Sequence, residues 1–106
     1  MRVLFDQGTP APLRDHLSHH EVATAYERGS TKLTNGELLD AAETNGFAVL
    51  ITTDTNLRYQ QNLRSRRIAI VALSTTSWPR IQDAATEVVL AVDTAIGGGY
   101  IEVPIP

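Results

Sequence analysis

The sequence contains no cysteine among its 106 residues, and only a single lysine. Without cysteine the chain forms no disulfide, thiolate nucleophile or thiolate metal site, although carboxylates remain available to bind a hard metal ion. No apolar run approaches the ~18 residues that a membrane-spanning helix needs. The first residues also lack the apolar stretch of a signal peptide, so we expect a cytoplasmic protein without membrane contact.

Charge and hydrophobicity fit an ordinary small domain. Acidic residues outnumber basic ones by 12 to 9, and the net charge of −3 gives no overall attraction to a polyanion. A local basic patch is compatible with that balance. The hydrophobic share of 42% is sufficient for one core, so we expect a single domain over residues 1–106.

Three short apolar runs have the composition of strands buried on both faces, as in a parallel sheet. They cover residues 2–5, 48–51 and 68–73. Residues 19–25 and 100–103 alternate more weakly and are expected at the sheet edges. Helical patterns lie between the strands, over residues 10–17 with Thr9 as N-cap, 34–44, 56–62 and 79–92. This alternation predicts a three-layer α/β/α sandwich with a mostly parallel central sheet.

Three acidic residues are expected at the carboxyl edge of that sheet, where open α/β folds bind their ligands. Asp6 follows the first strand, Asp54 follows a central strand, and Glu37 opens the helix before that strand. Two of them also have a structural explanation, because Asp54 can cap the next helix and Glu37 completes a capping box with Thr34. Carboxylates gathered in one place repel each other unless a cation joins them. Mg²⁺ or Mn²⁺ fits such a place, since both prefer oxygen ligands.

A basic patch follows the central strand. It consists of four arginines within ten residues, Arg58, Arg64, Arg66 and Arg67. Tyr59 and three amide side chains lie among them, a mixture that suits contacts to phosphates and bases. We therefore expect these arginines to bind RNA, and the alternative left open is a solvated surface of salt bridges.

His16, His19 and His20 lie close together in the sequence and raise the question of a zinc site. His16 and His20 have the spacing of one helix face, but the expected helix ends between them. The interpretation that the sequence favours is therefore that these histidines are solvated turn residues.

Three segments resemble the PIN-domain nuclease superfamily, in particular its small bacterial branch related to toxin–antitoxin ribonucleases. They are LFDQGTP near the start, TNGELLDAAETNGF in the middle and LITTDTNLRYQQNL after it, and the resemblance spans residues 2–73. It implies a Mg²⁺- or Mn²⁺-dependent ribonuclease whose catalytic, metal-binding acids are Asp6, Glu37 and Asp54. It also implies an antitoxin protein as partner and a homodimer.

Many relatives in that superfamily carry a further acid two residues after the third one, where this chain has Asn56. This departure leaves fewer negative ligands for a second metal ion, and Asp40 is the nearest substitute. We expect Asn56, Thr53, Thr55 and Asp40 to lie around the metal-binding acids and to support them.

The main hypothesis from the sequence is a metal-dependent endoribonuclease that acts as the toxin of a toxin–antitoxin pair. Because of Asn56, the alternative is a PIN-like module that binds RNA or a protein partner with weak or no catalysis. A flavodoxin- or receiver-like domain is a third interpretation. A receiver needs an acidic pair after its first strand and a lysine after its last, whereas Gln7 follows Asp6 and Lys32 lies in an expected loop.

Overall fold

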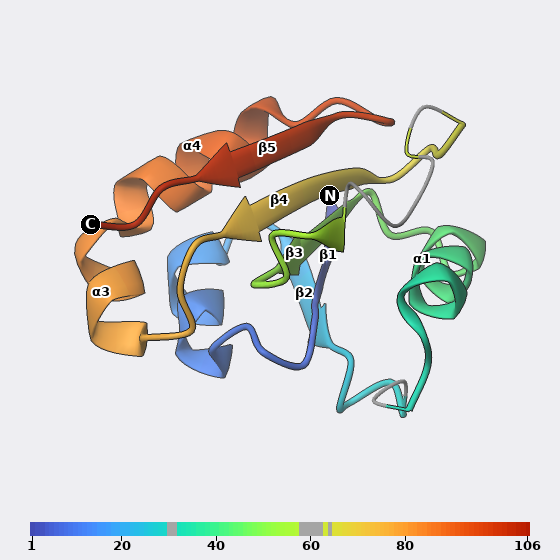
Figure 1. Ribbon diagram of the computed structural model, residues 1–106, viewed down its shortest axis with the longest axis horizontal. Coiled ribbons are helices and arrows are strands. Elements are labelled where there is room, and N and C mark those ends of the chain that lie inside the picture. The colour runs from blue at the N-terminus through green and yellow to red at the C-terminus, as the bar shows by residue number, and fades with distance from the viewer. Residues whose placement is uncertain (30–31, 58–62, 64) are drawn as a thin grey trace.

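The computed structural model describes residues 1–29, 32–57, 63 and 65–106, which form a central sheet with helices on both sides (Figure 1). The elements in chain order are β1 (Arg2–Phe5), the 3₁₀ helix η1 (Ala11–Leu17), β2 (Glu21–Thr24), α1 (Asn35–Thr44), β3 (Val49–Thr52), β4 (Ala69–Leu73), α3 (Trp78–Asp83), α4 (Ala85–Thr94) and β5 (Tyr100–Val103). The predicted three-layer α/β/α sandwich is confirmed. None of the described helices has the length and apolar character needed to cross a membrane.

The five strands lie in the order β2-β1-β3-β4-β5, and every neighbouring pair is parallel. All described strands therefore end at the same edge of the sheet, here called the carboxyl edge, and begin at the opposite, amino edge. This is the doubly wound order of flavodoxin-like folds, in which the direction of winding changes between β1 and β3. Ligands of such sheets bind in the crevice at that switch point.

Successive side chains of each strand point to opposite faces, so each fully apolar strand contributes to two cores. Phe5 and Ile51 pack with η1, α3 and α4 on one face. Leu4 and Leu50 pack on the other face against Leu39 of α1. This double burial explains why the inner strands are continuous apolar runs rather than alternating ones.

The start of η1 differs from the expected helix start. Its N-cap is Pro10, without a capping hydrogen bond from a side chain, so the prediction of Thr9 as N-cap is wrong. Thr9 is buried, and its hydroxyl donates to the carbonyl oxygen of Ile51 at 2.9 Å. A hydroxyl buried beside a strand end finds its best acceptor on that strand, and it fixes the loop after β1 against β3.

The helix expected over residues 79–92 is two helices. α3 and α4 meet at Ala84, whose backbone angles of φ −107° and ψ 18° leave the helical region. The apolar side chains of both helices, Ile81 and Val88 among them, still face the same core, and this is why the sequence pattern continued across the break. The edge positions predicted for the second and the last strand are confirmed. The helix expected over 56–62 falls largely on residues outside the described part.

Candidate metal centre at the carboxyl edge

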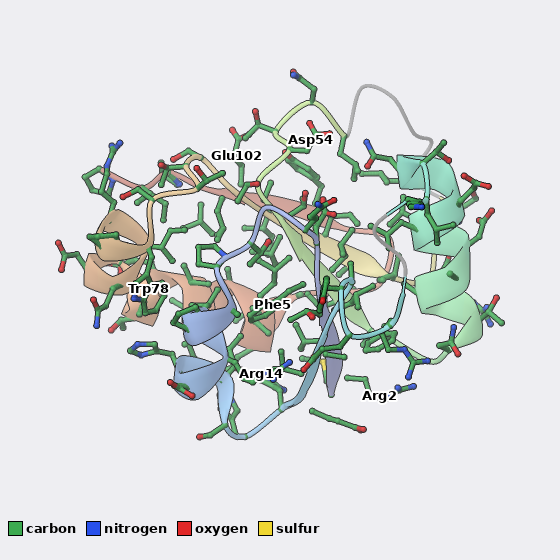
Figure 2. The ribbon with its side chains drawn as sticks, turned by 90° about the horizontal axis from the view of Figure 1, so that it is seen from below. Arg2, Phe5, Arg14, Asp54, Trp78 and Glu102 are labelled. Carbon is green, nitrogen blue, oxygen red and sulfur yellow. The ribbon has the colours of Figure 1, made fainter. Side chains whose placement is uncertain are left out.

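Asp6 and Asp54 lie at the same edge of the sheet, on the two strands that flank the switch point. Asp6 follows β1 directly, and Asp54 follows β3 after one intervening residue. Figure 2 shows Asp54 at the carboxyl edge and Arg2 at the far end of the sheet. The two acids are separated by 48 positions in the sequence, and the parallel pairing of β1 with β3 brings them together.

One buried hydroxyl connects the two acids. Thr52 is fully buried, and its Oγ1 donates to Oδ2 of Asp6 at 2.8 Å. The same Oγ1 accepts a hydrogen bond from the backbone N–H of Asp54 at 3.0 Å. The backbone N–H of Asp6 in turn donates to the carbonyl oxygen of Ile51 at 2.9 Å, which continues the sheet ladder to the site. Thr53 and Thr55 were the hydroxyls predicted to support the acids, whereas the hydroxyl that lies between them belongs to Thr52.

Asp54 also caps the segment that follows it. Its Oδ1 accepts the backbone N–H of Asn56 at 3.0 Å, and its Oδ2 accepts from Nδ2 of Asn35 at 3.1 Å. Asn35 is the first residue of α1, so this bond brings the start of α1 to the end of β3. An ionised carboxylate has about four lone-pair sites, so these two bonds leave Asp54 able to bind a cation.

Glu37 forms the capping box that the sequence predicts. Its backbone N–H donates to Oγ1 of Thr34 at 3.3 Å, and its Oε1 accepts the backbone N–H of Thr34 at 2.9 Å. The hydrogen bond from the Thr34 backbone, followed by that from its hydroxyl, lowers the pKa of Glu37, so the exposed carboxylate is ionised. Glu37 therefore has the structural role of a capping residue, and this role turns its carboxylate toward Thr34.

The three predicted acids are brought to one region but do not form a tight cluster. In the described part of the chain, only one group of three or more histidines or acids has its ligand atoms within 4.8 Å of one another. That group consists of His19, His20 and Asp93. Binding of one ion by Asp6, Glu37 and Asp54 together would therefore require side-chain movement, most simply a rotation of Glu37 away from its cap. Asp6 and Asp54, joined through Thr52, are the part of the site that is already in place.

The residues predicted to support the acids are used in different ways. A Cβ added at Gly8 would collide with Oγ1 of Thr53, so Thr53 lies directly against the loop after Asp6. The carbonyl oxygen of Thr55 accepts a hydrogen bond from the hydroxyl of Tyr100 at 3.4 Å. Asn56 contributes its backbone N–H to Asp54. Asp40 is paired with the guanidinium of Arg66 and lies one helical turn from Glu37, on the side away from the strand ends.

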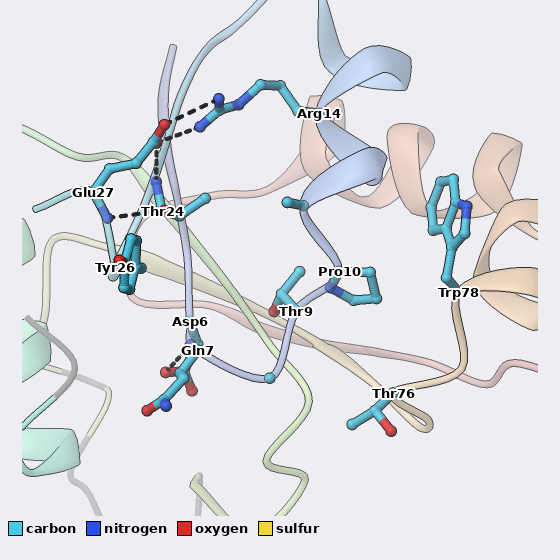
Figure 3. Close-up of a pocket in the computed structure, with 12 residues that line it drawn as sticks. Asp6, Gln7, Thr9, Pro10, Arg14, Thr24, Tyr26, Glu27, Thr76 and Trp78 are labelled. Atoms are coloured by element: carbon cyan, nitrogen blue, oxygen red, sulfur yellow. Dashed lines mark hydrogen bonds and ion pairs between the residues drawn. The ribbon is translucent and has the colours of Figure 1, made fainter.

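A cavity of about 710 Å³ opens beside Asp6, on the side of η1 (Figure 3). The loop after β1, the residues at the end of β2 and the segment before α3 line it, and Tyr26 and Trp78 add aromatic surface. Arg14 donates two hydrogen bonds to the carboxylate of Glu27, one of them at 3.2 Å from Nη1 to Oε2. The bond to Glu27 raises the pKa of Arg14, and the same bond lowers the pKa of Glu27, so both groups are charged. No pattern in the sequence indicated this cavity, because its walls come from three separate segments.

The two arginines of the predicted basic patch that the structure describes lie away from the two strand-end acids. Arg66 and Arg67 precede β4, so they are at the amino edge of the sheet, opposite Asp6 and Asp54. Nη1 of Arg66 is bound by Asp40 and, at 2.8 Å, by Oε1 of Glu43. Arg66 is therefore engaged in salt bridges, and its contact with RNA stays a prediction. The side chain of Arg67 is 84% exposed, whereas Arg58 and Arg64 lie outside the described residues, so their RNA contacts stay predictions.

The salt-bridge network at the amino edge joins Arg66 and Arg67 to Asp40 and Glu43, and its stability depends on pH through Glu43. Burial alone would raise the pKa of Glu43, but hydrogen bonds from the Arg66 side chain and from the Arg67 backbone outweigh burial and lower it. A depressed folded-state pKa stabilises the protein above the ordinary value of 4.5, and this stabilisation disappears as the pH falls through the folded value. We expect Glu43→Gln to lower the free energy of unfolding by about 1–2 kcal/mol at pH 7 and by much less near pH 3.

Urea unfolding of the wild type and of Glu43→Gln at both pH values measures this difference. Asp83→Asn serves as control, because Asp83 is exposed at the end of α3 and its substitution should change little at either pH. An equal loss for Glu43→Gln at both pH values would show that the charge of Glu43 is not what stabilises the network.

The chain was also compared with known proteins. No protein-family model, curated protein or solved structure matches it. The assignment of a function therefore depends on the geometry of the carboxyl edge and on the chemistry of its residues.

Proposed function

We propose that this protein is a Mg²⁺- or Mn²⁺-dependent endoribonuclease whose metal is held at the carboxyl edge by Asp6 and Asp54, with Glu37 as a third ligand. The observation that carries the proposal is the pair of aspartates at the β1/β3 switch point, where the buried hydroxyl of Thr52 donates to the carboxylate of Asp6 and accepts the backbone N–H of Asp54. Two carboxylates with a hydroxyl between them form an all-oxygen donor set, which suits a hard divalent ion and not a soft one.

Each residue of the site has a definite task in this proposal. Such an ion, when bound, supplies polarisation of the phosphodiester and a water of lowered pKa. Thr52 fixes the rotamer of Asp6 and the backbone of Asp54, so both acids are oriented before metal or substrate arrives. The hydrogen bonds from Thr34 lower the pKa of Glu37 while it caps α1, and the capped carboxylate is an ionised ligand held in reserve at the start of α1.

The cavity beside Asp6 is the proposed place for the nucleotide next to the cleaved bond. Its volume of about 710 Å³ lies within the ~300–1,000 Å³ range of small-molecule sites. Tyr26, whose surface is 82% exposed, and Trp78 offer rings on which unpaired bases can stack. Arg14 adds a positive charge to the same wall, although its pairing with Glu27 weakens the attraction for phosphate.

A second candidate function is a binding module without turnover. Asn56 in place of an acid, and the carboxylate of Glu37 turned toward its own helix cap, both favour it. The strand order is also shared with receiver domains, but fold alone does not determine function. The single lysine of the sequence, Lys32, precedes α1 and does not follow the last strand as a receiver requires.

The roles as a toxin, as the partner of an antitoxin protein and as a homodimer belong to the same proposal. They derive from the resemblance to small PIN-domain proteins. Leu90 on α4 and Ile96 after it are 62% and 78% exposed, and they are the apolar side chains that a protein partner would cover.

The test is cleavage of a fluorescent single-stranded RNA with Mg²⁺, with Mn²⁺ and with a chelator. The proposal predicts cleavage with either ion and none with the chelator. Salt-dependent binding of the RNA without cleavage in any divalent ion would instead identify the protein as a binding module.

A further inference from the structure

A second group of metal-binding side chains lies at the amino edge of the sheet, away from the carboxylates at the strand ends. His19 and His20 occupy the turn between η1 and β2, and Asp93 is in the last turn of α4. Nε2 of His19 and Nε2 of His20 lie 2.8 Å and 2.7 Å from the same atom, Oδ1 of Asp93. The three ligand atoms all lie within 4.8 Å of one another, although His20 and Asp93 are 73 positions apart in the sequence.

The turn explains how two consecutive imidazoles face the same way. In a strand they would point to opposite faces, but the backbone N–H of His20 donates to the carbonyl oxygen of Leu17 at 2.9 Å and curls the chain. The two rings consequently lie with centroids 4.0 Å apart and planes tilted by 45°. His16 is not part of the group and packs against Trp78, with ring centroids 5.9 Å apart.

Burial and charge distinguish this group from ordinary surface histidines. The side chain of His20 is only 7% exposed, so the interpretation of solvated turn residues is wrong for this histidine. Asp93 adds a negative charge to the negative end of the α4 dipole, and the last turn of α4 contains no basic residue. The hydrogen bond from His20, followed by that from His19, lowers the pKa of Asp93. The local field therefore favours a cation between the imidazoles and the carboxylate.

We propose that His19, His20 and Asp93 bind a divalent transition-metal ion of the zinc and cobalt class through the two Nε2 atoms and a carboxylate oxygen. Two imidazoles and one carboxylate are a common donor set for such ions, and the exposure of His19 leaves room for water as a further ligand. Mg²⁺ is disfavoured here because it prefers oxygen ligands, so the two proposed sites have opposite metal preferences. A bound ion would join the η1–β2 turn to α4.

Metal binding must move protons within the group. Nδ1 of His20 accepts from the N-terminal ammonium of Met1 at 3.2 Å, which places the ring proton of His20 on Nε2. Coordination through Nε2 requires that proton to leave, either to Nδ1, which breaks the hydrogen bond from the Met1 amine, or to solvent. His19 only exchanges its proton between the two ring nitrogens or releases it. Because the coordinating nitrogens must give up their protons, protons compete with the ion, and the affinity should fall in acid.

Calorimetric titration with Zn²⁺ at pH 7.5, together with the visible absorption of bound Co²⁺, tests the proposal on the full chain. We expect one Zn²⁺ per chain for the wild type. In His19→Ala and in Asp93→Asn the affinity for Zn²⁺ should fall by more than about 10–100-fold. A fall of that size is typical when only an outer partner of a metal ligand is lost, so a larger one indicates loss of a ligand itself. Asn at position 93 keeps an oxygen that accepts from the imidazoles, so this variant should fold normally, as circular dichroism would show.

His16→Ala and Asp83→Asn are the matched controls, and both should bind Zn²⁺ as the wild type does, while Asp6→Asn tests whether the ion lies at the carboxyl edge instead. If the wild type binds no Zn²⁺, or if His19→Ala and Asp93→Asn bind it equally well, the proposal is overturned. A loss confined to Asp6→Asn would place the Zn²⁺ at the carboxyl edge instead and would overturn it as well.

Discussion

Asp6→Asn should lower the rate of Mn²⁺-dependent RNA cleavage by about 10²-fold or more, because a lost metal ligand removes several kcal/mol of transition-state stabilisation. The substitution should leave the fold intact. The amide oxygen of asparagine can accept the backbone N–H of Gln7, which now binds Oδ1 of Asp6 at 2.7 Å. Its amide nitrogen can donate to Oγ1 of Thr52 in place of the present bond. Initial rates of cleavage of a fluorescent RNA at saturating Mn²⁺ measure the effect.

Variants of the other two acids show whether the site acts as a unit. Asp54→Asn removes the charge of the second metal-binding acid and should cause a loss of similar size. The asparagine oxygen still accepts from Asn56, so the cap of the following segment is kept. Glu37→Gln is informative because glutamine also suits the N3 position of a capping box, so the helix start is kept while the charge is removed. Asp83→Asn, an exposed acid at the end of α3, should cleave at the wild-type rate. Equal rates for the wild type and Asp6→Asn would remove the proposed site.

Thr52→Val should lower the free energy of unfolding by about 1–3 kcal/mol and reduce cleavage in the same protein. Valine has nearly the volume of threonine, so packing at this fully buried position changes little. Without the hydroxyl, however, Oδ2 of Asp6 loses a donor and the backbone N–H of Asp54 loses its acceptor. Both groups are partly buried, so water replaces the lost bonds only incompletely.

Thr52→Ser separates the hydrogen bonds from the packing. Serine keeps the hydroxyl and removes one methyl group, at a cost of about 0.8 kcal/mol if that group is fully buried. Urea unfolding and the cleavage assay should show Thr52→Ser close to wild type in rate and Thr52→Val clearly slower. A rate for Thr52→Val equal to that of the wild type would mean that Thr52 does not position the acids.

Local patterns in the sequence were sufficient to predict the fold class. Each inner strand is a continuous apolar run because helices cover both faces of the sheet, and that composition is visible without coordinates. The capping box of Thr34 and Glu37 is equally local and is confirmed. The break at Ala84 was not predictable, because the apolar spacing continues through it.

The arrangement of the site depended on long-range pairing and was only partly predictable. The prediction that Asp6 and Asp54 meet at one edge needed only the parallel direction of their strands, and it is confirmed. The sequence does not show which of several adjacent threonines turns inward, and this is why Thr52 was missed. Nor does it show that Arg66 pairs with Asp40 and Glu43, or that Asp93 meets two histidines from the other end of the chain. Those contacts depend on how helices pack on the sheet.

The most direct test of the central claim is to locate a bound hard cation. Mn²⁺ broadens NMR signals of nuclei close to it, so a titration of ¹⁵N-labelled protein reports the site residue by residue. We predict selective broadening of the backbone amides of Gln7, Asp54 and Asn56, abolished in Asp6→Asn and unaffected by His19→Ala. Absence of broadening at these amides while Mn²⁺ is bound elsewhere, or broadening that persists unchanged in Asp6→Asn, would contradict a metal centre at the ends of β1 and β3.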